Sequence, residues 1–292
     1  MTVGIKLPYF DFLLDLLASK DPSVEQAFGR HVHWGYWPDP ASATGQGEDY
    51  AAAAERLALV LLEAAGVRPQ ERILDVGCGF GGTTALLNDR FEGMDLRGLN
   101  PDIRQLERAR SLVSARPGNT VFFEEGDACA LPYPESRFDR VLALESIFHF
   151  PSRERFFREA FRTLRAGGTL AITDFVPSAA ALPLVRLATE MPALGRFQYF
   201  GRCDLSFTRR AYRRLAERVG FVPVAGQDIT LHTLPTYRFL NGLVDHSPLP
   251  KGTKIAAETL LKMMSLFSNA GLLTYHLFTF QKPDGVASDK RG

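Results

Sequence analysis

The sequence ILDVGCGFGG, residues 73–82, decides the fold of this chain. Apolar residues lead into Asp75, and four glycines follow at positions 77, 79, 81 and 82. Apolar residues that end in an acid are typical of the end of a buried parallel strand. The glycines favour a tight turn that brings the backbone close to a ligand before a helix begins. By itself such a turn indicates only a nucleotide-like ligand, so the flanking sequence has to identify it.

The sequence that follows this turn predicts a parallel sheet with crossover helices, because short apolar runs alternate with helical patterns. The predicted strands are 72–76, 96–99, 121–125, 138–144 and 169–175, and the predicted helices are 82–90, 102–115 and 153–164, the last ended by Gly167 and Gly168. Further on we expect a helix over 208–219 capped by Thr208, a strand over 220–229, a largely helical stretch over 237–267 broken by two prolines, and a last strand over 272–281. Residues 1–70 read as mainly helical.

Composition excludes several classes of function. A chain of 292 residues can form one large α/β domain with an insertion, and a net charge of +1 gives no field for nucleic acid or an anionic membrane. No apolar run reaches the roughly 20 residues that span a bilayer, and acids interrupt the apolar patch at 10–18, so we expect no signal peptide and no stable membrane insertion. The three cysteines form no CxxC pair, which favours a reducing, cytoplasmic location.

Two classes of α/β protein use such a glycine turn. A dinucleotide dehydrogenase needs GxGxxG, which Gly77, Gly79 and Gly82 satisfy, but also an acid closing the second strand, where this chain has Leu99 and Asn100. A methyltransferase that uses S-adenosylmethionine needs an acid at the turn, another after the third strand and a site residue after the fourth. The acids Asp75, Asp127 and Glu145 occupy these places. The second class therefore fits better.

Residues 30–175 resemble the class I S-adenosylmethionine-dependent methyltransferases, in the branch of sterol, tocopherol, cyclopropane-fatty-acid-like and bacterial natural-product enzymes. The matching motifs are ILDVGCGFGG (73–82), GLNPDIRQ (98–105), GDACALPYP (126–134), ESIFHFPSR (145–153) and LRAGGTLAITDF (164–175). The resemblance implies a Rossmann-like sheet, mostly parallel with an antiparallel last strand. It further implies an N-terminal helical lid (1–65), a core (66–282) with inserted cap segments near 177–207 and 231–270, and a flexible tail (283–292).

The resemblance also implies S-adenosyl-L-methionine as the cofactor. Asn100 and Gln105 would hold the ribose, in place of the acid that many relatives have there, and an amide pair can hydrogen-bond a diol in both directions. Asp127 and the Ala128 amide would bind the adenine. Tyr36, in the aromatic segment HVHWGYWPDP (31–40), would face the sulfonium. The remaining expected cofactor contacts are Asp75, Gly77, Cys78, Gly79 and Glu145. His31 and His33 alternate without a third ligand nearby, so we expect no metal.

The reacting end of the pocket is predicted around His149, whose imidazole can pick up a proton reversibly near neutral pH. Asp174, at the end of the fifth strand, would hold the ring in the useful tautomer. This arrangement favours O-methylation of a small aromatic or lipophilic acceptor, with aromatic residues such as Phe197, Tyr199 and Phe200 capping it. Two alternatives stay open: C-methylation of a sterol-, quinone- or isoprenoid-like acceptor with Glu145 stabilising a carbocation, and a non-catalytic cofactor-binding module. A homodimer is a possible assembly.

Overall fold

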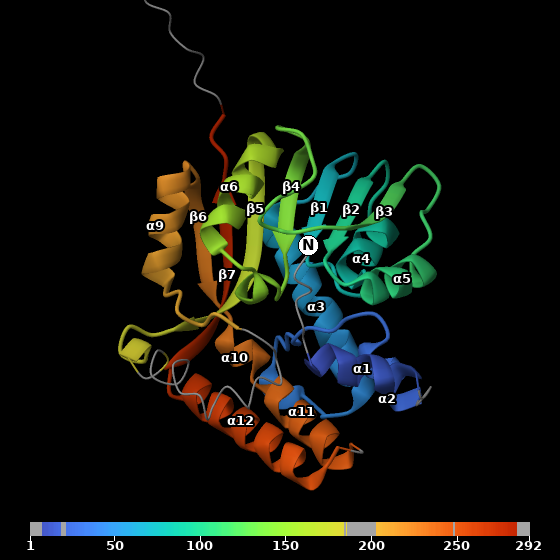
Figure 1. The fold of residues 1–292 in the computed structure, drawn as a ribbon, viewed down its shortest axis with the longest axis vertical. Helices are drawn as coiled ribbons and strands as arrows, with labels where there is room; N and C mark the ends of the chain where they lie inside the picture. The colour runs from blue at the N-terminus through green and yellow to red at the C-terminus, as the bar shows by residue number, and fades with distance from the viewer. Residues whose placement is uncertain (1–7, 19–21, 184, 186–202, 248, 285–292) are drawn as a thin grey trace, which may run out of the picture.

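A seven-stranded sheet in the order β3-β2-β1-β4-β5-β7-β6 forms the centre of the protein (Figure 1). The computed structural model describes residues 8–18, 22–183, 185, 203–247 and 249–284. The strands are β1 (Arg72–Val76), β2 (Asp95–Asn100), β3 (Thr120–Glu125), β4 (Phe138–Ala143), β5 (Leu164–Pro177), β6 (Val222–Asp228) and β7 (Leu273–Gln281). β1 to β5 pair in parallel, and β7 runs antiparallel between β5 and β6. The predicted Rossmann-like sheet with an antiparallel last strand is confirmed.

Helices cover both faces of this sheet and also lie beyond one of its ends (Figure 1). They are α1 (Pro8–Ala18), α2 (Pro22–Phe28), α3 (Gly47–Ala65), α4 (Gly82–Arg90), α5 (Ile103–Leu112), α6 (Arg153–Thr163), α9 (Arg209–Val219), α10 (Thr230–Thr233), α11 (Pro235–His246) and α12 (Lys251–Asn269), with 3₁₀ turns η1 (Pro40–Ser42) and η2 (Ile147–His149). Alternate residues of β1 explain the layers: Ile73 packs in the cluster of Leu57 and Leu61 from α3, and Leu74 in that of Phe157 from α6. Each fully buried side chain of this size contributes about 1.5–3 kcal/mol.

The helices α1, α2 and α10–α12 gather beyond one end of the sheet, in the lower half of Figure 1. This is the end at which the parallel strands finish, because the backbone N–H of Trp34, before α3, donates to Glu145, which follows β4, at 2.9 Å. The part of the predicted lid before α3 and the second cap segment therefore lie at the strand ends, where ligands of such sheets bind, whereas α3 itself packs on a face of the sheet. Most of the first cap segment and of the tail lie outside the described residues.

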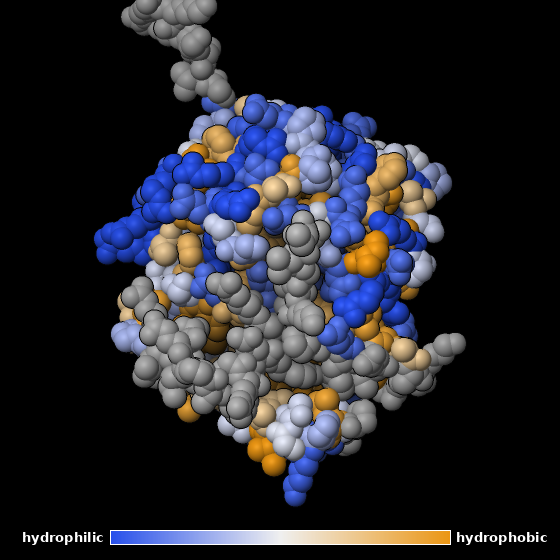
Figure 2. All heavy atoms as spheres, in the orientation of Figure 1, coloured by the Kyte–Doolittle hydropathy of each residue, from blue (hydrophilic) through white to orange (hydrophobic). Residues whose placement is uncertain are grey.

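The surface seen in Figure 2 is mainly hydrophilic over α6 and α9, where charged side chains such as Arg158 (62% exposed) and Arg213 (74% exposed) form ion pairs along each helix. Among the described residues, no helix combines the length and apolarity that crossing a membrane requires.

The prediction that two glycines end the helix over 153–164 was wrong. Gly167 and Gly168 do not end the helix before them: α6 ends at Thr163, and β5 begins directly at Leu164 and includes both glycines. Leu164 leaves the helix because its fully buried side chain belongs to the core and its backbone pairs with Phe138 on β4. Elsewhere the strand and helix boundaries lie close to those predicted, and the Thr208 cap is confirmed by its hydrogen bond from the Ala211 amide at 3.2 Å.

Candidate active site

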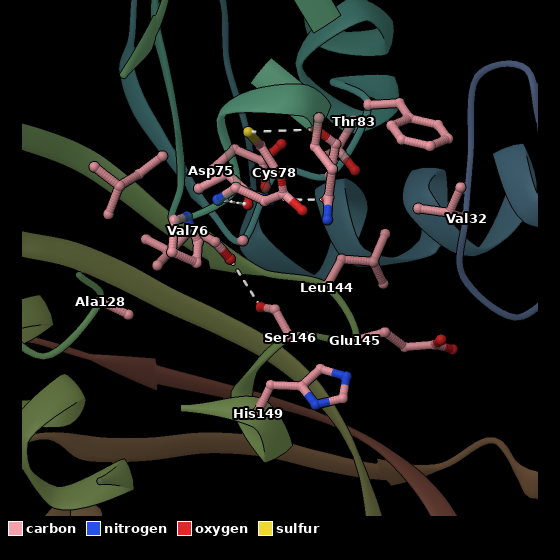
Figure 3. A pocket seen from close by; sticks show the side chains of 18 of the residues that line it. Val32, Asp75, Val76, Cys78, Thr83, Ala128, Leu144, Glu145, Ser146 and His149 are labelled. Carbon is pink, nitrogen blue, oxygen red and sulfur yellow. Dashed lines mark hydrogen bonds between the residues drawn. The ribbon is translucent and has the colours of Figure 1, made fainter. Parts of the chain in front are cut away.

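The glycine turn joins β1 to α4 and packs against the segment after β4. Gly77 has φ of +77°, and a Cβ at this position would lie 2.4 Å from Cβ of Ser146. Ser146 in turn donates from Oγ to the carbonyl of Val76 at 2.8 Å, the dashed contact in Figure 3. Only a residue without a side chain lets these two loops approach so closely.

Asp75 ends β1 inside the protein, where its Oδ2 accepts a hydrogen bond from Thr84 Oγ1 at 3.0 Å. Burial raises the pKa of this carboxyl to about 7. Thr84 lies in the first turn of α4, so the hydrogen bond also ties the helix to the strand. Asp75 therefore holds the turn and lines the cavity beside it.

A cavity of about 640 Å³ opens beside the glycine turn. Its walls are the turn itself, the segment 30–33, the end of β2 with the start of α5, the loop after β3 and the segment 144–151 (Figure 3). The structure brings together here most of the residues predicted from sequence, namely Asp75, Gly77, Cys78, Gly79, Asn100, Gln105, Asp127, Ala128, Glu145 and His149. Tyr36 and Asp174 are not among the lining residues.

One end of this cavity carries amide and carboxylate groups. Asn100 donates from Nδ2 to Oε1 of Gln105 at 3.2 Å, which confirms that the two predicted amides are neighbours. Asp127 accepts from the amide of Cys129 at 2.8 Å. Asp102 also lines this end and was missed because it follows the strand by two residues; it caps α5 and pairs with Arg104, which lowers the pKa of its carboxyl against the effect of burial.

Glu145 lies at the other end in a left-handed conformation, with φ of +49°. Its Oε1 accepts hydrogen bonds from the Trp34 amide at 2.9 Å and from the Tyr275 hydroxyl at 2.5 Å. Burial raises the pKa of Glu145 to about 8. A non-glycine residue in this conformation is uncommon. The carboxyl joins the segment before α3, the loop after β4 and β7 at one point of the cavity wall.

His31 and His33 form a buried pair that the sequence did not place in the cavity wall. His33 Nδ1 lies 2.9 Å from the carbonyl of Trp34, and His33 Nε2 lies 3.1 Å from His31 Nδ1. Burial lowers the pKa of both, that of His33 to about 4, so both are neutral. Since the Trp34 carbonyl only accepts, Nδ1 of His33 carries the proton of that ring, and Nε2 of His33 is left as an acceptor. Nδ1 of His31 therefore carries the proton and donates it to His33 Nε2. Across the residues that the structure describes, no cluster of three metal-binding side chains occurs.

His149 ends the short η2 turn and lies in the cavity wall with Ser146 and Glu145, below the glycine turn in Figure 3. Its Nδ1 is 3.7 Å from Sγ of Cys203. Asp174 is not brought to this ring: its Oδ2 accepts hydrogen bonds from Arg153 Nη2 at 2.8 Å and from the Tyr212 hydroxyl. No spacing in the sequence points to Arg153 as the partner, because this residue comes from a separate helix, α6.

Tyr36 also has a different environment from the predicted one. Its ring stacks on His232, with centroids 4.6 Å apart, and packs against the core cluster around α3. Trp34, two residues earlier, is wedged between Phe175 and Tyr237 at centroid distances of 5.0 and 4.4 Å. These aromatic rings therefore anchor the segment 31–40 to the core, and its histidines reach the cavity instead.

Comparisons with known proteins agree with this site. Residues 74–172 match the family described as "Methyltransferase domain". The 27-O-demethylrifamycin SV methyltransferase of Amycolatopsis mediterranei is 34% identical over 284 residues, covering 94% of this chain and 96% of that protein. Methyltransferase GfsG of Streptomyces halstedii is 36% identical over 215 residues, 72% of each chain.

Two solved structures share the fold. The [4+2]-cyclase SpnF has a TM-score of 0.72 at 23% identity, over 98% of this chain and 100% of that one. The geranyl diphosphate C-methyltransferase from Streptomyces coelicolor, solved with Mg²⁺, geranyl diphosphate and S-adenosyl-L-homocysteine, has a TM-score of 0.67 at 20% identity, over 94% and 98%.

Together with these relatives, the Rossmann-like sheet, its glycine turn and the cavity beside it identify a small-molecule methyltransferase. The chain belongs to the S-adenosylmethionine-dependent methyltransferases. Its cofactor is S-adenosyl-L-methionine, and the cavity fits this molecule in volume and in its combination of amide, carboxylate and apolar walls.

Proposed function

We propose that the protein transfers the methyl group of S-adenosylmethionine to a hydroxyl oxygen of a lipophilic small molecule made in natural-product biosynthesis, with His149 as the general base. The observation that carries this proposal is the position of His149 in the same cavity wall as Glu145 and Ser146. The name of the relative that matches 94% of the chain, an O-demethylrifamycin methyltransferase, supports an oxygen acceptor.

In this proposal, each part of the cavity wall binds one part of the cofactor, and His149 acts on the acceptor. When bound, the cofactor supplies an electrophilic methyl group. The turn around Gly77 and Gly79 would hold its amino-acid part, the amides of Asn100 and Gln105 its ribose, and Asp127 with Ala128 its adenine. His149 would take the proton of the acceptor hydroxyl as the oxygen becomes a nucleophile. The buried walls exclude water, and alignment of the two reactants supplies most of the remaining catalysis.

The proposed adenine contact predicts a loss of affinity in Asp127→Ala. A hydrogen bond to a charged group contributes about 1.5–3 kcal/mol, so S-adenosylhomocysteine should bind roughly 10- to 100-fold more weakly. Calorimetry should compare this analogue with one that has a carbonyl in place of the adenine amino group. The variant and the natural chain should bind the second analogue equally; equal losses for both analogues would contradict the assignment.

The raised pKa values of Asp75 and Glu145, about 7 and 8, predict a pH-dependent preference for the cationic cofactor. A sulfonium nearby favours the ionised carboxylates, so its binding releases protons and tightens as the pH rises through this range. The affinity for S-adenosylmethionine relative to its neutral-sulfur product should therefore rise about threefold or more between about pH 6.5 and 8.5. Calorimetry at both values tests this, and a flat ratio would contradict it; Glu145→Gln should reduce the rise.

In the protein without cofactor, the same two carboxyl groups make folding stability fall as the pH rises, whereas they make cofactor binding tighten. Because their folded-state pKa values are raised, they favour folding below about pH 4, and this contribution is lost as the pH rises through 7 and 8.

Two other functions remain candidates. C-methylation is favoured by the buried Glu145 carboxyl, which could stabilise a carbocation, and the fold is shared with a geranyl diphosphate C-methyltransferase. A role without methyl transfer is suggested by the shared fold of a [4+2]-cyclase. Incubation with methyl-labelled S-adenosylmethionine and three acceptor sets (hydroxylated macrocycles, phenols and prenyl compounds) separates them. We expect transfer to hydroxylated acceptors; transfer only to prenyl compounds, or tight cofactor binding without transfer, would favour the alternatives.

We further propose that the protein functions in the cytoplasm. The three cysteines are free, and two of them are buried, which supports function in a reducing cytoplasm. We propose a homodimer as the assembly, which light scattering of the purified chain would test.

A further inference from the structure

Asp174 and Arg153 form an ion pair in the interior of the protein. Arg153 Nη2 lies 2.8 Å from Asp174 Oδ2, and the two side chains are 1% and 0% exposed. Removing two charges from water costs free energy that two packed apolar side chains would not, so such a pair is weak evidence for a role in stability. The pair instead fixes the position of a neighbouring segment, because Arg153 also binds the side chain and the backbone of Asp204.

The Arg153 guanidinium joins three parts of the fold, β5, α9 and the segment 203–206. From Nε it donates to the Tyr212 hydroxyl at 2.7 Å, and from Nη1 to Asp204 Oδ2 at 2.6 Å. A further hydrogen bond runs from Nη2 to the backbone carbonyl of Asp204 at 2.5 Å. The guanidinium also lies over the Phe207 ring, 4.7 Å from its centroid. Asp204 is thus held by both its side chain and its backbone.

The segment fixed in this way packs directly on the turn that carries His149. The amide of Asp204 donates to the carbonyl of Phe148 at 2.9 Å. The preceding residue, Cys203, places Sγ 3.7 Å from Nδ1 of His149. Asp204 Oδ1 accepts from the Ser206 amide at 2.9 Å, which closes the segment on itself. A continuous set of contacts therefore leads from Asp174 through Arg153 and Asp204 to His149.

We propose that Arg153 is a positioning residue for the reacting end of the cavity: anchored by Asp174 and Tyr212, it holds the segment 203–206 against the His149 turn. This inference rests on the proposed function, in which His149 is the base. Asp174, expected from sequence to orient the imidazole by a direct hydrogen bond, acts on it through Arg153 and Asp204. A planar guanidinium suits this place because it presents several donors in a fixed fork, which a lysine cannot.

The test uses Asp204, whose side chain is 42% exposed and can be changed at little risk to folding. Asp204→Ala removes the side-chain contact with Arg153, and Asp204→Asn keeps one acceptor of the same size. Because small misplacements of a catalytic group cost rate, we expect Asp204→Ala to lower kcat about 10-fold with the affinity for S-adenosylhomocysteine unchanged. Asp204→Asn should recover most of this loss, and Arg153→Lys should resemble Asp204→Ala. Arg158→Ala, on the exposed face of the same helix, is the control.

A second readout does not depend on activity. Cys203 is the one partly exposed cysteine, whereas Cys78 and Cys129 are buried, so alkylation located by peptide mass spectrometry reports on the segment. Asp204→Ala should raise the alkylation rate of Cys203 about fivefold or more, because local opening precedes reaction. If His149 proves not to be the base, this rate still tests the contacts. An unchanged alkylation rate in Asp204→Ala, or an unchanged kcat in an enzyme that needs His149, would overturn the proposal.

Discussion

Replacing His149 with alanine is expected to lower kcat for transfer to a hydroxyl acceptor by about 100-fold or more, since a positioned general base contributes roughly 10²- to 10⁴-fold. The acceptor would then have to lose its proton to water. S-adenosylhomocysteine should still bind within about threefold of the unchanged protein, because His149 contributes one side chain to a cavity with many other walls. Timed assays of the labelled methylated product measure kcat, and calorimetry of S-adenosylhomocysteine binding measures the affinity.

The matched control is His232→Ala, which removes an imidazole that stacks on Tyr36 and is not among the residues of the cavity wall. This control should keep kcat within a few-fold. Near-normal turnover in His149→Ala, or falls of equal size in His149→Ala and His232→Ala, would remove the base assignment. A loss of cofactor affinity in step with the loss of rate would show that His149 serves binding instead.

Gly77→Ala is expected to weaken binding of S-adenosylhomocysteine by about 100-fold or more. A left-handed conformation costs a non-glycine residue about 1–2 kcal/mol, and here the new Cβ would also meet Cβ of Ser146 at 2.4 Å. The turn and the loop after β4 must then separate, and both line the cavity. Calorimetry of S-adenosylhomocysteine binding measures the loss of affinity, and thermal unfolding of the free chain measures the loss of stability.

Gly118 supplies the comparison for this prediction. It has a similar φ of +86°, but a Cβ there would meet no atom within 4 Å, so Gly118→Ala isolates the backbone cost. This variant should lose some stability and keep its cofactor affinity. Adding Ser146→Gly to Gly77→Ala removes the clashing Cβ and should restore part of the affinity. Equal affinities in Gly77→Ala and Gly118→Ala would refute the steric explanation.

Most of the fold and the cofactor end of the site follow from local sequence. The strand before Asp75 and the turn after it depend on apolar runs and glycines that lie next to each other in the chain, and the structure has β1 and α4 at the predicted residues. Asn100 and Gln105 are five residues apart, at a strand end and the first turn of the next helix. Their contact is a consequence of that geometry, so it could be predicted.

The partners of side chains from distant segments could not be predicted in the same way. The Asp174 side chain does lie in the interior of the protein. Whether its partner is His149 or Arg153 depends on how α6 packs on β5, and no spacing in the sequence indicates that packing. Tyr36 shows the same limit, because its ring packs on His232, which comes from α10 far along the chain. The sequence singled out the aromatic rings of the segment 31–40, whereas His31 and His33 lie in the cavity wall.

The most direct test of the proposed O-methylation is the position of the label after turnover with ¹³C-methyl S-adenosylmethionine and a hydroxylated macrocyclic acceptor. Carbon NMR of the isolated product distinguishes a methyl group on oxygen from one on carbon. We predict that the label is found on a single acceptor oxygen, with one S-adenosylhomocysteine formed per product and the rate lost in His149→Ala. A label on carbon, or consumption of no cofactor in the presence of acceptors that bind, would contradict the proposed function.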